Sequence, residues 1–477
     1  MLQILSTLKI QTKGLLAGGL LLGAQVFVNA QCSTTGWKKV SQGENYSIAL
    51  KEDGTIWIWG QNTYGLLGNG SAAATEIKHP TQIGTDANWT DISTGRNFAL
   101  AIKGNGDLYG WGANYYGEQG TGNNTDLSAP TLIQQNVKAF SAGYYHTMIV
   151  KTDGTLWGAG YNDYSGLGVG TSTFSYNTFQ QEATKATDWA TVTATYYNSF
   201  AIKTDGTLWS AGANAEGQNG LGTPGSVGAQ TATFTQVGTD KNWKAIAGGL
   251  HHTLGLKTNG ELWSWGRSLY GNLGLGNTTQ YFTPQQIPGT TWAAIGATNE
   301  SSSALKTDGS LWTWGYNGYG ILGIGTTTSV STPTKVGTEN TWKNIPVRSG
   351  ENSSGGIKTD TALFTWGADS YWQLGNNDGT ATNSTVPTQV TCIDNQLAVN
   401  DVSSEKKVSL YPNPTKDVVV LQSAKAVSEV KVYNLAGSLV KSFTNVSDNK
   451  INVSDLSAGV YVVKINNSAE GVKLIKK

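Results

Sequence analysis

Few residues in this sequence could carry acid–base, thiol or metal chemistry. Across 477 residues, the histidines and cysteines are His79, His146, His251, His252, Cys32 and Cys392. No two histidines stand four apart with a glutamate between them, as zinc peptidases require. The aspartates recur in Asp-Gly pairs about fifty residues apart, a pattern better suited to hairpin turns than to paired acids and bases. We therefore predict no enzyme, no metal site and no cofactor.

Binding is the chemistry that remains. Two-residue positions recur before one predicted strand of each repeat described below, and their side chains vary while the surrounding frame is kept. The candidate binding residues at these positions are Tyr144, Tyr145, Tyr196, Tyr197, Leu250 and His251. Tyrosine is enriched at interface hot spots, so consecutive aromatic pairs favour a recognition surface. Plain surface tyrosines are the simpler alternative.

A sevenfold repeat must position these residues. The segment 53–60, Asp-Gly-Thr-Ile-Trp-Ile-Trp-Gly, returns at 105–112, 153–160, 205–212, 259–266 and 308–315, and in a degenerate form at 360–367. The leading aromatics are Trp57, Tyr109, Trp157, Trp209, Trp263, Trp312 and Phe364. Seven units of this kind form either a closed ring or an open solenoid.

Each unit has the pattern of four short strands. In residues 98–102, large apolar side chains alternate with alanine, as in a strand with one packed face. This segment leads into Asn105-Gly106, a two-residue hairpin signal. A returning strand, a glycine-rich loop and a Pro-x-x-Val or Pro-x-x-Ile strand follow. Four strands per unit predict an all-β, seven-bladed β-propeller, and the 17 tryptophans are expected to pack between its blades.

The segments 143–157 and 314–323 and their copies resemble the regulator of chromosome condensation repeat over residues 35–392. The resemblance implies a seven-bladed propeller but no single function, because the family includes nucleotide-exchange factors for small GTPases, a plant photoreceptor and a secreted β-lactamase inhibitor. In that inhibitor, residues after an Ala-Gly element help to form the binding face. Tyr144 follows Ala142-Gly143, whereas Tyr196 follows Ala194-Thr195, a departure from the pattern.

The two cysteines flank the predicted ring. Cys392 falls two residues after Val390 and Cys32 five before Trp37, so both belong to the loop where a closed ring would join its ends. We predict a Cys32–Cys392 disulfide that ties the first blade to the last, since an exported protein meets an oxidising compartment. Two unpaired thiols are the alternative.

The ends of the chain predict export. Residues 1–30 carry Lys9 and Lys13, then a short apolar run and Ala30, as in a secretory signal peptide. The propeller would occupy 31–392 and a polar linker 393–406. Short alternating runs in 407–477 predict a small, immunoglobulin-like β-sandwich.

This last segment resembles the C-terminal sorting domain of type IX secretion substrates from Bacteroidota. The motif residues are Pro412, Asn413, Pro414, Gly437, Gly459, Tyr461, Lys476 and Lys477. The resemblance implies recognition by the type IX machinery and passage across the outer membrane, to the cell surface or the medium. A structural module that stays attached is the alternative.

Charge separates the two modules. The chain has 32 basic and 32 acidic side chains, but the basic excess lies in the last seventy residues and the acidic excess in the predicted ring. A mildly acidic ring disfavours nucleic acid, because phosphate binding needs clustered Lys and Arg. We expect a monomeric, exported propeller that binds an extracellular protein. The alternatives are a carbohydrate-binding or adhesive module and, further off, a hydrolase with an unrecognised site on the propeller axis.

Overall fold

The computed structural model describes residues 33–392, except 74, 223–228, 348–349 and 377–379, and residues 409–477, except 423–425, 435–436, 445, 447 and 467–471. The chain divides into two compact units, Met1–Asp394 and Asn395–Lys477. The predicted signal peptide, Cys32 and the predicted linker lie outside the described residues. Among the described residues there is no helix of the length and apolarity needed to cross a membrane.

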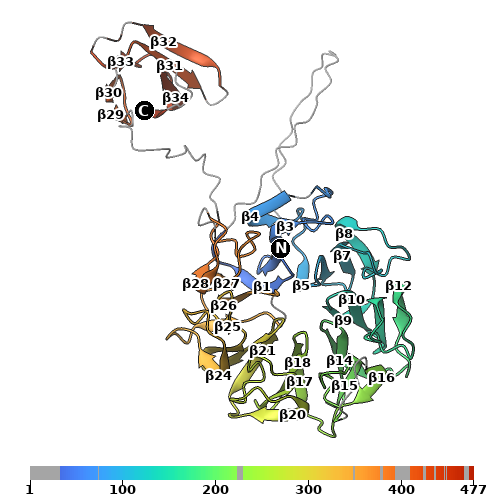
Figure 1. The fold of residues 1–477 in the computed structure, drawn as a ribbon. Helices are drawn as coiled ribbons and strands as arrows, with labels where there is room; N and C mark the ends of the chain where they lie inside the picture. The colour runs from blue at the N-terminus through green and yellow to red at the C-terminus, as the bar shows by residue number, and fades with distance from the viewer. Residues whose placement is uncertain are drawn as a thin grey trace, which may run out of the picture. The chain divides into compact units, whose positions relative to one another are not determined.

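The first unit consists of seven four-stranded antiparallel sheets in a ring (Figure 1), which confirms the predicted all-β propeller. We number them blades 1–7 in chain order. The first strands are β1 (Trp37–Gln42), β5 (Trp89–Thr94), β9 (Val137–Ala142), β13 (Trp189–Ala194), β17 (Trp243–Gly248), β21 (Trp292–Ala297) and β25 (Trp342–Asn344). The second strands are β2 (Tyr46–Lys51), β6 (Phe98–Lys103), β10 (His146–Lys151), β14 (Asn198–Lys203), β18 (His252–Lys257), β22 (Ser301–Lys306) and β26 (Ser353–Lys358). The third strands are β3 (Ile56–Asn62), β7 (Leu108–Gly112), β11 (Leu156–Tyr161), β15 (Leu208–Ala213), β19 (Leu262–Gly266), β23 (Leu311–Gly315) and β27 (Leu363–Gly367). The fourth strands are β4 (Thr75–Gln82), β8 (Leu127–Gln134), β12 (Ser175–Gln181), β16 (Gln230–Gln236), β20 (Tyr281–Ile287), β24 (Val330–Lys335) and β28 (Ser384–Gln389).

The first strands lie innermost, because they contact one another from blade to blade, as β9 contacts β13 and β17 contacts β21. The propeller therefore has two faces. The loop face carries the turns from first to second strands and the loops from third to fourth strands. The hairpin face carries the turns from second to third strands and the connections between blades.

The turns of the hairpin face depart from the predicted two-residue form. In blade 1, the amide of Gly54 donates to the Lys51 carbonyl and that of Lys51 to the Thr55 carbonyl, which closes a three-residue turn. Gly54 has a φ of 79°, the left-handed conformation that such a turn needs. Asp53 Oδ1 accepts hydrogen bonds from both the amide and the hydroxyl of Thr55. The aspartates therefore cap turns.

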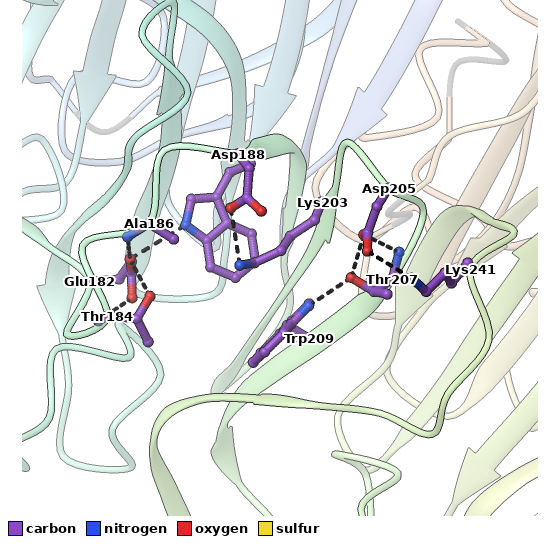
Figure 2. Close-up of polar contacts among 10 residues, drawn as sticks. Glu182, Thr184, Ala186, Asp188, Lys203, Asp205, Thr207, Trp209 and Lys241 are labelled. Atoms are coloured by element: carbon purple, nitrogen blue, oxygen red, sulfur yellow. Dashed lines mark hydrogen bonds and ion pairs between the residues drawn. The ribbon is translucent and has the colours of Figure 1, made fainter.

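A lysine at the end of each second strand packs on aromatic rings beside this turn, a feature that the sequence analysis missed. In blade 4, Lys203 Nζ lies 4.8 Å from the ring centroid of Trp189 and 4.7 Å from that of Trp209. Asp188 pairs with the same ammonium at 3.0 Å (Figure 2). The Trp209 indole N–H donates to Thr207, which is bonded to Asp205. The cation–π contacts thus offset part of the hydration that the ammonium loses when the lysine is buried.

The ring closes between blades 7 and 1, where β1 contacts β26 (Figure 1). The carbonyl oxygen of Gln373 accepts hydrogen bonds from Trp59 Nε1 at 2.9 Å and from the Ser47 hydroxyl at 2.7 Å. The amide of Trp37 donates to the Thr361 carbonyl. Cys392 packs against the same core cluster as Trp37. The first described residues of the ring therefore meet the last.

The second unit has seven strands among its described residues. They are β29 (Ser409–Tyr411), β30 (Val418–Gln422), β31 (Glu429–Asn434), β32 (Leu439–Thr444), β33 (Lys450–Asn452), β34 (Gly459–Ile465) and β35 (Val472–Lys476). They form two sheets, ordered β29-β30-β33 and β32-β31-β34-β35. Val419 of the first sheet and Val463 of the second belong to one buried apolar cluster. The immunoglobulin-like assignment stays a prediction.

Candidate binding face

The candidate tyrosines lie on the loop face, in the turns between the first and second strands of blades 3 and 4. Backbone hydrogen bonds join these turns across blades. The amide of Arg96 in blade 2 donates to the Tyr144 carbonyl, and the amide of Tyr144 donates to the Thr195 carbonyl in blade 4. Because main-chain hydrogen bonds join the turns, the Cα positions from which the tyrosine side chains project are fixed relative to one another.

The four tyrosines belong to a larger aromatic cluster that spans blades 2–4. Tyr144 stacks on Tyr196 with ring centroids 4.4 Å apart, and Tyr145 meets Tyr116 edge to face at 4.9 Å. The members of this tyrosine cluster are Tyr115, Tyr116, Tyr144, Tyr145, Tyr161, Tyr164, Phe174, Tyr196 and Tyr197. Each such ring pair stabilises the cluster beyond the area that it buries, by roughly 0.5–1.5 kcal/mol.

The predicted members form the base of the cluster and the unpredicted members its surface. Tyr144 and Tyr196 are buried, while Tyr145 and Tyr197 are half-buried. The exposed rings are those of Tyr115 (72% exposed), Phe174 (55%) and Tyr164 (37%). All three come from loops between third and fourth strands. These loops can be found in the sequence by their glycines, but nothing in the sequence alone says that they fold over the neighbouring turns.

An arginine binds the base of the cluster. Arg96 donates to both carboxylate oxygens of Glu44, at 2.7 and 2.8 Å, and also to the Tyr145 hydroxyl. Its guanidinium carbon lies 5.1 Å from the ring centroid of Tyr144. The hydrogen bonds that Arg96 donates to Glu44 raise the pKa of Arg96, and burial raises the pKa of Tyr145. The base is therefore held by an ion pair and a hydrogen bond that link blades 1, 2 and 3.

One contact crosses the propeller axis. The Tyr144 hydroxyl donates to Glu351 Oε1 in blade 7, on the far side of the ring. Burial, and then the Glu351 carboxylate, raise the pKa of Tyr144. On the axis, a cavity of about 50 Å³ is lined by strand residues of blades 1–5 and by Val347 of blade 7. This cavity is too small for a substrate, and Tyr144 bridges the ring at the loop face.

The other two candidates lie in blade 5. Leu250 donates its amide to the Asn299 carbonyl, and the His251 carbonyl accepts from the amide of Arg267. Arg267 in turn pairs with Glu300 at 2.5 Å. Burial, with the Arg267 charge as a lesser cause, lowers the pKa of His251 to about 4. His251 is therefore neutral at physiological pH.

His146 and His252, each the first residue of a second strand, serve the frame. His146 Nε2 lies 3.0 Å from the Ser199 hydroxyl, and His252 Nε2 lies 2.9 Å from that of Ser302, so equivalent histidines join successive blades. Burial lowers the pKa of His252 to about 3. Within the described part of the chain, no three His, Cys, Asp or Glu side chains gather as metal ligands would. The loop face thus offers rings, hydroxyls and amides, which suit binding.

In the second unit, most sorting-motif residues gather around the last strand. Asn413, between Pro412 and Pro414, donates through Nδ2 to the Lys473 carbonyl and accepts from the amide of Ile475. Gly459 and Tyr461 on β34 pair with Lys476 and Leu474 on β35, and the Lys477 amide donates to Thr415. Gly437 lies apart from them, in the turn between β31 and β32, with a φ of 79°. Residues of three of the four motifs thus meet at β35.

Comparisons with known families agree with this architecture. The RCC1-like domain profile matches residues 25–293, and the regulator of chromosome condensation (RCC1) repeat matches 308–355 and 360–404. The secretion system C-terminal sorting domain matches 409–477. The second unit therefore marks the chain for type IX export to the cell surface or the extracellular space.

Curated relatives share about a quarter of the aligned residues. The Ultraviolet-B receptor UVR8 of Arabidopsis thaliana is 27% identical over 52% of this chain and 57% of its own length. The human Regulator of chromosome condensation is 26% identical over 50% and 49%, respectively. The Probable E3 ubiquitin-protein ligase HERC6 of Homo sapiens is 28% identical over 52% of this chain but 25% of its own. The chain spans about half the length of the first two.

Solved structures share the fold. Human WBSCR16 superimposes with a TM-score of 0.62 at 21% identity, covering 71% of this chain and 95% of that one. Prp20p from Saccharomyces cerevisiae gives 0.62 at 19% identity, covering 76% and 89%. Since the RCC1-like profile spans more than half of the sequence, the chain belongs to the RCC1-like domain family and carries a secretion system C-terminal sorting domain.

Proposed function

We propose that the exported propeller is a non-enzymatic module that binds an extracellular protein through the tyrosine cluster of its loop face. One observation carries this proposal. Three exposed rings, those of Tyr115, Tyr164 and Phe174, stand together on a base that a bidentate ion pair and main-chain bonds hold rigid. Rigid aromatic anchors lose little entropy on binding, so they concentrate binding energy in a small area.

A protein ligand suits the dimensions of this face. The cluster spans three blades and its outermost rings are exposed, whereas small-molecule sites enclose most of their ligand. Its rim carries polar groups such as Asn124, which donates to the Tyr115 carbonyl, and Asp163, which lies 3.4 Å from the Tyr161 hydroxyl. Aromatic centres with polar rims are the usual composition of protein interfaces.

The test is capture of partners from the culture environment with the full chain as bait. We expect a specific protein to be retained by the unmodified chain and lost by a triple variant, Tyr115→Ala with Tyr164→Ala and Phe174→Ala. The matched control replaces Tyr64, Tyr270 and Tyr319, which are exposed rings of the loop face in blades 1, 5 and 6. Equal loss in both variants, or retention by the first, would contradict the assignment of the tyrosine cluster.

Carbohydrate binding is the second candidate, because exposed tyrosine rings also stack on sugar faces. Tyr115 is the most exposed ring of the cluster, and Asn124 beside it offers amide hydrogen-bonding groups. A glycan array probed with the same chain and the same variants separates the two. Glycan binding lost with Tyr115→Ala would favour the sugar over the protein.

A further inference from the structure

A second cavity lies away from the tyrosine cluster, between blades 5 and 6. It has a volume of about 540 Å³, within the range of small-molecule sites. Its lining includes Leu275, Ile287, Pro288, Trp312 and Pro333, which make apolar walls. Trp292 and Lys306 complete it at the hairpin face.

Lys306 differs from most of its counterparts in the ring. Its Nζ lies 4.8 Å from the Trp292 ring and 4.2 Å from the Trp312 ring, like the lysines of other blades. In four blades an acidic side chain neutralises the equivalent ammonium. These pairs are Lys103–Asp86, Lys203–Asp188, Lys257–Asp240 and Lys358–Glu339. Among the described residues, Lys306 has no ion pair.

The two other unpaired lysines lack the same setting. Lys51 donates to the Ser33 carbonyl at 2.9 Å. Lys151 packs on Trp157, and its blade begins with Val137 where others have tryptophan, so a second ring is absent. Lys306 thus combines two indoles, no acid and an adjoining cavity.

The sequence explains why the acid is absent. Trp89 follows Ile83 by six positions, whereas Trp292 follows Ile287 by five, and the residues between Ile287 and Trp292 include no acid. The carboxylate of Asp308, two residues after Lys306 in the chain, accepts hydrogen bonds from the hydroxyl and amide of Ser310 in the hairpin. These bonds, with the Lys306 charge as a lesser cause, lower the pKa of Asp308, but the two side chains form no ion pair among the described residues. Asp308 is therefore committed to its turn.

Blade 4 shows what fills this position elsewhere (Figure 2). There, Asp188 pairs with Lys203, and Glu182 Oε1 lies 3.4 Å from Trp189 Nε1. In blade 6, Ile287 stands in the place of Glu182 and Thr291 in that of Asp188. Within the part of the chain that the structure describes, the buried Trp292 Nε1 has no hydrogen-bond partner, as is also true of Trp37, Trp89 and Trp243. Both polar groups that a carboxylate satisfies in blade 4 are left open in blade 6.

We propose that this cavity binds a small organic carboxylate, whose acid group pairs with Lys306 and whose body lies on Trp312 and the prolines. An ammonium beside apolar walls forms a charge-assisted hydrogen bond of greater strength than one in open water. The indole and proline walls favour a ring-shaped body, either aromatic or sugar-like. This site is independent of the protein-binding face, because it lies in other blades.

The test is isothermal titration calorimetry of the full chain with two acids and their neutral counterparts. Phenylacetate is compared with phenylacetamide, and glucuronate with glucose. We expect saturable binding of at least one acid and not of its neutral counterpart, and the acid that binds tells an aromatic body from a sugar. Binding of the neutral compounds with equal affinity, or no saturation by either acid at millimolar concentration, overturns the proposal.

Three variants locate the binding. Lys306→Gln should raise the dissociation constant at least about tenfold, because the charge-assisted bond is lost. Thr291→Asp should do the same from an exposed position, by supplying an internal carboxylate like that of Asp188. Thr291→Asn, the neutral counterpart, should leave binding unchanged. If Thr291→Asp binds as the unmodified chain does, the acid does not sit on Lys306 and the proposal fails.

Discussion

At the scale of single residues, the most consequential group beneath the tyrosine cluster is the carboxyl of Glu118. Its side chain is buried, and Oε2 accepts the amide of Tyr116 at 2.9 Å. Two equivalent loops hold glutamine here, and Gln218 and Gln373 accept the amides of Glu216 and Tyr371 in the same way. Burial, with the Asp126 charge as a lesser cause, raises the pKa of Glu118 to about 7.

This pKa predicts a pH-dependent stability. Folded Glu118 holds its proton to a higher pH than the unfolded chain does, so the free energy of unfolding should fall as the pH rises from about 4.5 to about 7. The glutamate contributes a loss of roughly 3 kcal/mol over that window. Glu118→Gln keeps the bond to Tyr116 and should flatten the profile, making the variant the more stable protein at pH 8.

Urea unfolding of the two proteins at pH 5 and pH 8 measures the effect. The control is Asp163→Asn, which removes an exposed carboxylate. This variant should leave the dependence of the free energy of unfolding on pH unchanged. An identical pH profile for the unmodified chain and Glu118→Gln would show that Glu118 ionises in the folded state as freely as in the unfolded one.

Sequence reasoning at this scale found the turn positions and missed what covers them. Tyr144 and Tyr196 were predicted because their frame repeats, and the structure places them at the buried base of the cluster. Tyr115, Tyr164 and Phe174 come from loops of unequal length, and their positions depend on packing against neighbouring blades. No period within the sequence encodes that contact.

At the scale of the blade, the space between the third and fourth strands is filled by one of two residue pairs. Five blades have a tryptophan on the third strand and a proline on the fourth, and at Gly68 the space beside the glycine is bordered by both Trp111 and Pro130. In blades 3 and 4 the pair is Ala159 with Phe179 and Ala211 with Phe234. The bulk lost from the third strand is supplied by the fourth.

The tryptophans also hold blades together through their indole N–H. Each donates to a main-chain carbonyl of the preceding blade's loop, as Trp314 does to Asn272 and Trp366 to Ile321. The alanines of blades 3 and 4 cannot, so these two interfaces depend on aromatic packing alone at this position. They are also the blades that carry the tyrosine cluster.

Replacing the Ala211–Phe234 pair of blade 4 by a tryptophan and a proline tests whether the two residues fill the same space. Ala211→Trp alone should destabilise the propeller by about 1–3 kcal/mol, because the indole enters space that Phe234 fills. Phe234→Pro alone should cost about 3–5 kcal/mol, because it leaves a cavity. The double variant rebuilds the Trp–Pro pair. Its loss of unfolding free energy should be about 1–3 kcal/mol smaller than the sum of the losses of the two single variants.

Chemical denaturation of the four proteins gives the coupling energy. The distant pair Ala211→Trp with Val419→Ala, which lies in the other unit, is the additive control. Strict additivity of Ala211→Trp and Phe234→Pro would mean that the two positions do not share one space.

Much of the blade was predictable, because local signals repeat seven times. Alternation and glycine spacing predicted the strands. The first-strand tryptophans and those at the second aromatic position of the third strands are buried, with Trp37, Trp59 and Trp111 fully so, whereas the leading Trp157, Trp209, Trp263 and Trp312 are half-buried. The turns were misjudged as two-residue, since Asp53-Gly54 fits both forms and the choice depends on whether Thr55 pairs with Lys51. The Lys–Trp contacts were missed because they join residues of three strands.

At the scale of the whole molecule, the ring must be held shut where its ends meet. Main-chain and side-chain bonds at Gln373 and Thr361 join blades 7 and 1, but each is worth only about 1 kcal/mol net. Cys392 packs in the cluster of Trp37 at this junction, and the predicted partner, Cys32, lies five residues before that tryptophan. We propose a Cys32–Cys392 disulfide that fastens the junction.

A bond of this kind closes most of the chain into one loop, so it should act mainly on the unfolded state. The chain-entropy relation gives a stabilisation of roughly 5 kcal/mol for a loop of this size, as an upper figure. We expect Cys392→Ser to lower the free energy of unfolding by about 2–5 kcal/mol and Cys32→Ser to lower it equally, since either removes the same bond. The reduced unmodified protein should match both variants, and reduction should change neither of them further. Titration of thiols in the unfolded, unreduced protein decides the matter independently: none should react, whereas two reactive thiols would show that the ring is held by its blades alone.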